Sequence, residues 1–255
     1  MTMRMSSLSR STRALLGGGV IVGAIVGAVA VAGFVLLPAS ASQTAVLPAE
    51  LHRAVVLPAP LVDLAATESG YAVAVLGGGC FWGVQGVFQH VEGVVSAVSG
   101  YAGGTEEAAN YAAVVAGGSD HAEVVEITYD PTIVSYGALL HIFFSVVHDP
   151  TQLDQQWPDF GAQYRSVIFA GDEEEAEVAA LYIAQLDEAG VFEAPIVTRV
   201  EQGHPFYRAE DRHQDFVVRN PVSSYVVNID LPKIDDLERV FPDRFRAEPV
   251  LVLGD

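Results

Sequence analysis

Residues 71–90 read YAVAVLGGGCFWGVQGVFQH, and this stretch predicts a strand that turns directly into a helix. Residues 71–76 form a short apolar run, which is typical of a buried strand. Gly77, Gly78 and Gly79 then end the run, because three successive glycines let the backbone bend sharply. From residue 80 onward the apolar side chains recur at helical spacing, at Val84, Val87, Phe88 and Val91.

Strands and helices continue to alternate after this unit. Apolar runs predict further strands over residues 94–101, 122–129, 164–170 and 196–200. Apolar spacing and capping residues predict helices over residues 135–147, 172–189 and 211–219, with a polar loop over 105–120. The first six elements follow the order strand–helix–strand–strand–helix–strand, which is typical of the ferredoxin-like split βαβ unit. We therefore expect an α+β protein, a ferredoxin-like α/β plait with irregular loops.

The two ends of the chain differ from this body, which spans residues 71–221. Residues 1–42 combine a basic start, an uncharged apolar stretch and the run Ala39-Ser40-Ala41, which predicts a signal peptide or an uncleaved N-terminal membrane anchor. With either a signal peptide or an anchor, the remainder of the chain is expected on the periplasmic or extracellular side. Residues 43–70 contain three prolines and read as a spacer. Residues 222–255 form a C-terminal extension that we expect to pack on the domain.

Composition excludes several classes of function. Hydrophobic residues make up 51% of the 255 residues and charged residues 18%, so the chain can bury a core. The 13 Lys and Arg residues face 32 Asp and Glu residues, and a net charge of -19 disfavours binding to nucleic acid. The seven histidines, His121, His141 and His148 among them, do not follow a known metal-binding spacing, and we predict no metal site.

Cys80 is the chain's single cysteine and lies where the first strand turns into the first helix. A helix N-terminus favours the thiolate, which is the nucleophilic form of cysteine. This placement predicts a reactive thiol, and a buried, inert cysteine is the alternative. Phe81 and Trp82 come directly after Cys80. They are expected to line an apolar pocket beside the sulfur, and the alternative is that both are ordinary core aromatics.

Three further side chains complete the candidate site. Glu123 shares a face of its predicted strand with Val125 and Ile127, so it is expected to point inward. Burial raises a carboxyl pKa, and a protonated carboxyl can donate a proton; a solvated strand end is the alternative. Tyr111 and Tyr164 stand among polar residues, and their hydroxyls can hydrogen-bond a polar oxygen in a partly apolar pocket.

The chain resembles the type A methionine sulfoxide reductases, the peptide-methionine (S)-S-oxide reductases. The resemblance covers roughly residues 73–221 and begins at GCFWG, residues 79–83. Further matching motifs follow in the family order: GYAGG (100–104), NY (110–111), GSDHAE (118–123), YDP (129–131), HDPTQL (148–153), PD (158–159), QYRS (163–166), FY (206–207), AED (209–211), HQD (213–215) and NP (220–221).

The resemblance implies a set of roles for these residues. Cys80 would attack the sulfoxide sulfur and become a sulfenic acid, while Glu123, with Tyr111 and Tyr164, would protonate or hydrogen-bond the sulfoxide oxygen. The substrate methyl group would lie against Phe81 and Trp82, and Asp159 would support the polar network. No cofactor would be bound.

The chain departs from many family members after residue 221, where it has no further cysteine. It therefore resembles the one-Cys branch, and the Cys80 sulfenic acid would be reduced by an external thiol, a thioredoxin-like protein or a small molecule. Oxidised exported proteins, peptides or free methionine sulfoxide are the expected substrates of a monomer that repairs exported proteins. The alternatives are another exported thiol enzyme that reduces peroxides, or a non-catalytic domain that binds methionine sulfoxide.

Overall fold

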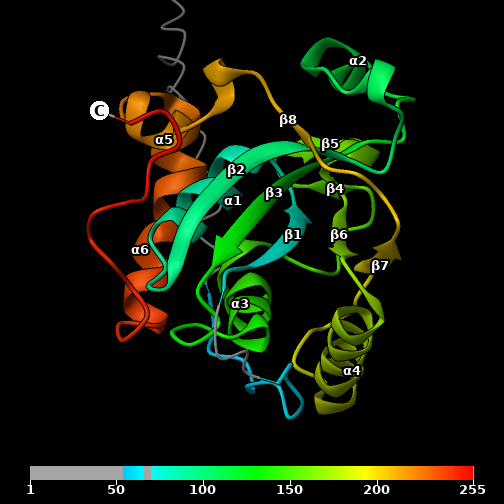
Figure 1. Ribbon diagram of the computed structural model, residues 1–255, viewed down its shortest axis with the longest axis vertical. Coiled ribbons are helices and arrows are strands. Elements are labelled where there is room, and N and C mark those ends of the chain that lie inside the picture. Colours follow the sequence, from blue (N-terminus) through cyan, green and yellow to red (C-terminus); the bar gives the residue numbers. More distant parts are fainter. Residues whose placement is uncertain (1–53, 66–69, 255) are drawn as a thin grey trace, which may run out of the picture. The chain divides into compact units, whose positions relative to one another are not determined.

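The structure is a computed structural model that describes residues 54–65 and 70–254. At its centre is a six-stranded sheet with the strand order β7-β6-β1-β3-β2-β8 (Figure 1). Its strands are β1 (Ala72–Gly78), β2 (Val94–Ala102), β3 (Ala122–Tyr129), β6 (Ser166–Ala170), β7 (Arg199–Gln202) and β8 (Tyr207–Arg208). β1 lies antiparallel between β3 and β6, β2 is antiparallel to β3 and β8, and β7 runs parallel to β6.

The four central strands, β6-β1-β3-β2, carry the predicted plait. The first crossover helix, α1 (Phe81–Gln89), joins β1 to β2, and α3 (Tyr136–Ile142) follows β3 on the way to β6. A π-helical turn over Phe143–Val147 extends α3 to the end of the helix predicted from the sequence. This order of two helices and four antiparallel strands confirms the α+β, ferredoxin-like fold class.

The remaining helices surround the sheet. They are α2 (Tyr111–Val115), α4 (Glu173–Ala189), α5 (Phe216–Arg219) and α6 (Leu231–Val240). A small hairpin, β4 (Gln155–Gln156) with β5 (Asp159–Phe160), precedes β6. The sequence correctly placed both ends of α4: the Asp172 carboxylate accepts a hydrogen bond from the Glu175 N–H at 2.9 Å, and Gly190 ends the helix in a left-handed conformation.

The glycines after the first strand do not end it where the sequence predicted. β1 continues through Gly77 and Gly78, and the chain bends only at Gly79, whose φ is +96°. A Cβ at Gly77 would lie 2.9 Å from the Glu123 carbonyl oxygen and 2.9 Å from Cγ1 of Val167. Gly77 is therefore needed for the close approach of the neighbouring strands, whereas a Cβ at Gly78 would meet the side chains of Phe143 and His148. Local pattern could not distinguish these requirements from a chain break.

Three other predicted boundaries were wrong. The expected polar loop over 105–120 contains α2, which Asn110 caps by accepting a hydrogen bond from the Ala113 N–H at 3.1 Å. The strand expected over 196–200 is β7, shifted to 199–202. The helix expected over 211–219 is a 3-10 turn followed by α5, because Asp215 takes a left-handed conformation with φ +54°.

The buried carboxylate of Asp215 accounts for that interruption. It accepts hydrogen bonds from the Gln89 side chain at 2.7 Å and from the N–H groups of Val252 and Leu253. The neighbouring Gln214 is fully buried and bonds to Ser99 in β2. Residues distant in sequence thus hold this segment in a shape that its own helical pattern does not specify.

Both flanking segments contribute to the core where the structure describes them. Within the expected spacer, Ala54 and Leu57 are buried, and the Ala54 N–H donates to the Asp236 carboxylate of α6 at 3.1 Å. In the expected C-terminal extension, Leu237 is fully buried and α6 packs against α1 (Figure 1). The predicted signal peptide or anchor over 1–42 lies outside the described residues. Among residues 54–65 and 70–254, no helix has the length and apolarity needed to span a membrane.

Candidate active site

Cys80 occupies the N-cap position of α1, directly after the bend at Gly79. β1 delivers the residue to this end of the sheet, and the positive φ of Gly79 redirects the chain into the helix. The side chain is almost buried, with 9% of its surface exposed. The strand-to-helix placement predicted from the sequence is therefore present.

Glu123 points inward from β3 toward this helix start, as its strand periodicity predicted. Its side chain is 1% exposed, and Oε2 accepts a hydrogen bond from the Phe81 N–H at 3.0 Å. Burial raises the pKa of Glu123 to about 8, against the lowering effect of hydrogen bonds from Phe81 and Cys80. The carboxyl is consequently protonated near neutral pH, as a proton donor must be.

The expected thiolate form of Cys80 is wrong for the resting site. Burial raises the pKa of the Cys80 thiol well above its ordinary value, and a negative charge on Glu123 or Asp230, when either ionises, raises it further. The Trp82 N–H at the helix start lowers the pKa, as expected, but this contribution is outweighed. Removal from water is thus the main reason that the sulfur is protonated in the resting site.

The two predicted tyrosines face the same centre from different elements. Tyr111 begins α2, its N–H donates to the Glu210 carboxylate at 3.1 Å, and its ring lies 4.3 Å from that of His213. Tyr164 ends the 3-10 turn Ala162–Tyr164, which packs against β3. Burial raises the pKa of both hydroxyls, and an ionised Glu123 raises both further. Both therefore remain protonated hydrogen-bond donors.

The aromatic pair after Cys80 divides between core and surface. Phe81 has no exposed surface and packs 5.8 Å from the Tyr101 ring. Trp82 is partly exposed and stacks on Phe216 of α5, with ring centroids 3.6 Å apart and planes 6° apart. Its indole N–H donates to Nδ1 of His213 at 3.3 Å. Trp82 is thus the member of the pair that a ligand can reach without rearrangement.

Asp159 begins β5 and accepts a hydrogen bond from the Tyr225 hydroxyl. Burial raises the pKa of Asp159, while the Tyr225 hydrogen bond and the charge of Lys233 lower it. The ring of Tyr225 also meets Trp82 edge-on at 5.8 Å. Asp159 and Trp82 are therefore joined through a residue of the C-terminal extension.

Sequence reasoning missed this contribution of the extension. Nothing in the local sequence marks Tyr225 or Asp230 as site residues, because a tyrosine and an acid at the start of a helix are usually found at the surface. His213 lies within a matching motif, HQD, but its contacts with Trp82 and Tyr111 depend on how α5 folds back over α1. Among the described residues, no three His, Cys, Asp or Glu side chains gather as a metal site.

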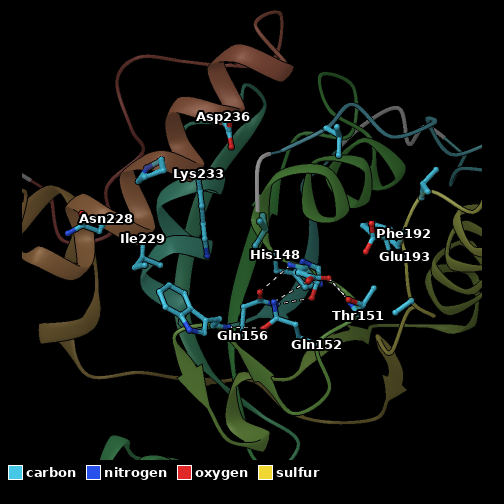
Figure 2. A pocket seen from close by; sticks show the side chains of 17 residues that line it. His148, Thr151, Gln152, Gln156, Phe192, Glu193, Asn228, Ile229, Lys233 and Asp236 are labelled. Carbon is cyan, nitrogen blue, oxygen red and sulfur yellow. Dashed lines mark hydrogen bonds between the residues drawn. The ribbon is translucent and has the colours of Figure 1, made fainter. Parts of the chain in front are cut away.

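A cavity of about 530 Å³ lies beside the site (Figure 2). Its walls come from the segment 147–157, from residues 191–194 and from residues 228–236 of the extension. Figure 2 shows Lys233 reaching from α6 into this cavity toward Gln156. Cys80 does not line it, but Cγ of Gln156 lies 2.7 Å from where a Cβ at Gly79 would stand. Gln156 therefore separates the cavity from the bend that carries the thiol.

Comparisons with known proteins agree with one another. Residues 72–244 match the family described as "Peptide methionine sulfoxide reductase". The "Peptide methionine sulfoxide reductase MsrA 2" of Mesorhizobium japonicum is 55% identical over 185 residues, covering 72% of this chain and 95% of the relative. Its namesake from Synechocystis sp. is 51% identical over 192 residues, covering 74% and 90%. The solved structure of methionine sulfoxide reductase A of Corynebacterium diphtheriae has a TM-score of 0.52 and 31% identity, covering 66% of this chain and 84% of that one.

Proposed function

Because the chain belongs to the peptide methionine sulfoxide reductase family and is a peptide-methionine (S)-S-oxide reductase, we propose that Cys80 is its nucleophile and passes through a sulfenic acid. One observation carries the assignment: the Glu123 carboxyl is buried at the start of α1 together with the thiol and accepts the Phe81 N–H there. This burial raises the pKa of Glu123 to about 8. A sulfoxide oxygen leaves its sulfur only when it is protonated, so a nucleophile and an acid must act on one substrate together.

In the first half-reaction, the Cys80 sulfur bonds to the sulfoxide sulfur while Glu123 protonates the oxygen. The oxygen then passes to Cys80, the sulfide leaves as methionine, and the thiol proton replaces the one that Glu123 gave. The sulfoxide is reduced by two electrons, and Cys80 is oxidised by two electrons to the sulfenic acid. The hydroxyls of Tyr111 and Tyr164 hydrogen-bond the oxygen, consistent with their protonated state.

The substrate methyl group lies against Trp82, whose stack on Phe216 holds the indole in place. Phe81 supports that wall from within the core, because its own side chain is not exposed. Asp159, held by the Tyr225 hydroxyl, keeps the polar side of the site in position. We assign substrate binding to Phe81, Trp82 and Asp159 together on this basis.

In the second half-reaction, an external thiol reduces the sulfenic acid. The chain has one cysteine, so no internal thiol can form a disulfide with Cys80. One thiol attacks the sulfenic sulfur and releases water, and a second thiol then attacks the mixed disulfide and frees Cys80. A thioredoxin-like protein or a small thiol supplies both equivalents, and no bound cofactor is needed.

Export is the further part of the proposal. The basic start, the apolar stretch and the small-residue run within residues 1–42 support an N-terminal signal or anchor that places the enzyme outside the cytoplasm. The enzyme would there repair oxidised exported proteins and act as a monomer. N-terminal sequencing of the exported form tests the leader, and retention of the whole chain in the cytoplasm would contradict export.

The activity is tested with separated R and S sulfoxides of a blocked methionine and dithiothreitol as reductant. We expect turnover of the S epimer alone, and loss of that turnover in Cys80→Ser. Substantial activity in this variant would remove Cys80 as the nucleophile. A peroxide-reducing enzyme would consume peroxide and spare both sulfoxides, and a non-catalytic binding domain would bind the S epimer without releasing methionine.

A further inference from the structure

Asp230 is a buried acid that has no role in the first half-reaction as proposed above. It ends the π-helical turn Val226–Asp230 and directly precedes α6. Its side chain has 0% of its surface exposed, and neither carboxylate oxygen has a hydrogen-bond partner. An unpaired buried carboxylate costs several kcal/mol, so a residue retained in this state calls for an explanation.

Asp230 lies against Gly83 in the first turn of α1. A Cβ at Gly83 would lie 2.5 Å from Oδ1 of Asp230 and 3.4 Å from Nζ of Lys233. Gly83 follows Cys80 by three residues, and positions three apart lie on the same face of a helix. Both charged groups of the extension therefore meet α1 on the face that carries the thiol, where Gly83 has no side chain to exclude them.

The groups around Asp230 make it electrostatically linked to the thiol. Burial raises the pKa of Asp230 to about 7, the charge of Lys233 lowers it, and Asp159 raises it. The charge of Asp230 in turn raises the pKa of Cys80 and of Tyr225. Lys233 is the chain's single lysine, and it also reaches the cavity beside the site (Figure 2).

We propose that Asp230 and Lys233 are opposed positioning charges that set how readily Cys80 loses its proton. An ionised Asp230 holds the sulfur as a thiol. Lys233 lowers the pKa of Asp230, but at the alkaline pH where the thiol titrates Asp230 is ionised with or without the lysine, so the ammonium opposes Asp230 through its own positive charge. The role rests on Cys80 being the nucleophile of the proposed function, and it deepens that assignment. Because no second cysteine can trap an oxidised Cys80, a protonated sulfur protects the enzyme from stray electrophiles and oxidants between turnovers.

The test measures the rate at which iodoacetamide alkylates Cys80 in the full chain between pH 6 and pH 11. The midpoint of the rate profile reports the ionisation of the thiol, and methionine sulfoxide is not required. In Asp230→Asn we expect the midpoint to fall by about one pH unit, the size of shift that one nearby charge produces. Alkylation below the midpoint would then be about tenfold faster. In Lys233→Met we expect the midpoint to rise.

Asp235→Asn is the matched control, because it removes the same charge from an exposed position of α6. Its midpoint should equal that of the wild type. A variant that merely loosened the fold would expose the thiol and speed alkylation, so Asp230→Asn and Lys233→Met would then shift together. Shifts in the same direction, or an unchanged midpoint in Asp230→Asn, overturn the proposal.

Thermal unfolding shows which variants are folded. Should Asp230→Asn fail to fold, the Lys233→Met profile decides the question, and a midpoint equal to the wild type refutes the proposal. The wild-type sulfoxide assay stands apart from these measurements. If the wild type reduces the sulfoxide but the variants leave the alkylation midpoint unchanged, the role of Asp230 and Lys233 is rejected and the proposed function stands. If the two variants shift the midpoint in opposite directions but the wild type has no reductase activity, only the proposed function is rejected.

Discussion

Replacing Glu123 by glutamine removes the acidic proton from the site and leaves most of the site's geometry intact. The glutamine amide oxygen can still accept the Phe81 N–H, the bond that holds Glu123 at 3.0 Å from the start of α1. The side chain keeps its length, and its position on β3 remains buried. The variant therefore tests the proton itself rather than the packing around it.

The expected loss follows from what remains. A positioned general acid contributes about 10²–10⁴-fold to a rate. The hydroxyls of Tyr111 and Tyr164 stay protonated and can still hydrogen-bond the sulfoxide oxygen, so we expect the lower end of that range. About a hundredfold loss corresponds to about 3 kcal/mol of transition-state stabilisation. Substrate binding should change little, because the carboxyl acts chiefly once the oxygen gains charge.

The assay is a single turnover with enzyme in excess over the S sulfoxide and no thiol reductant present. Methionine is quantified after rapid quenching, and the Cys80 sulfenic acid is trapped with dimedone and identified by mass spectrometry. Glu126→Gln, on the same strand but on its other face, is the matched control and should keep the wild-type rate. An unchanged first-turnover rate in Glu123→Gln would refute the role of Glu123 as the acid.

Three further predictions address stability. Glu123 keeps its proton up to about pH 8 in the folded chain but releases it near pH 4.5 in the unfolded chain. The free energy of unfolding of the wild type should therefore fall between these pH values relative to that of Glu123→Gln, by at most about 5 kcal/mol. A difference in urea unfolding that does not change with pH would contradict this. Gly77→Ala should lower the free energy of unfolding by about 1–3 kcal/mol, because its Cβ would meet the Glu123 carbonyl oxygen and Val167; wild-type stability in thermal unfolding would argue against this contact. Tyr225→Phe leaves the half-buried Asp159 without its hydroxyl partner and should lower the free energy of unfolding by about 1 kcal/mol, measured by chemical unfolding; a cost below about 0.5 kcal/mol would show that water replaces the hydroxyl.

The sequence alone determined the parts of this protein that depend on neighbours in the chain. The alternation of apolar runs and helical spacing predicted the central plait, and Asp172 and Gly190 marked both ends of α4. The strand-to-helix placement of Cys80 and the inward face of Glu123 were also predictable, since both follow from local periodicity. Local pattern failed at Gly77 and Gly78, where the requirement for glycine comes from adjacent strands and from the side chains of Phe143 and His148, respectively.

Only the tertiary structure decided how the site is charged. The helix start favours a Cys80 thiolate, but burial outweighs it and raises the pKa of the thiol, and the negative charge of an ionised Asp230 adds to this rise. Tyr225 and Asp230, more than a hundred residues from Cys80 in the sequence, meet the first turn of α1 at Trp82 and Gly83 through the packing of the C-terminal extension. A pKa depends on the water excluded and on the charges close in space, and neither quantity is encoded by spacing along the chain.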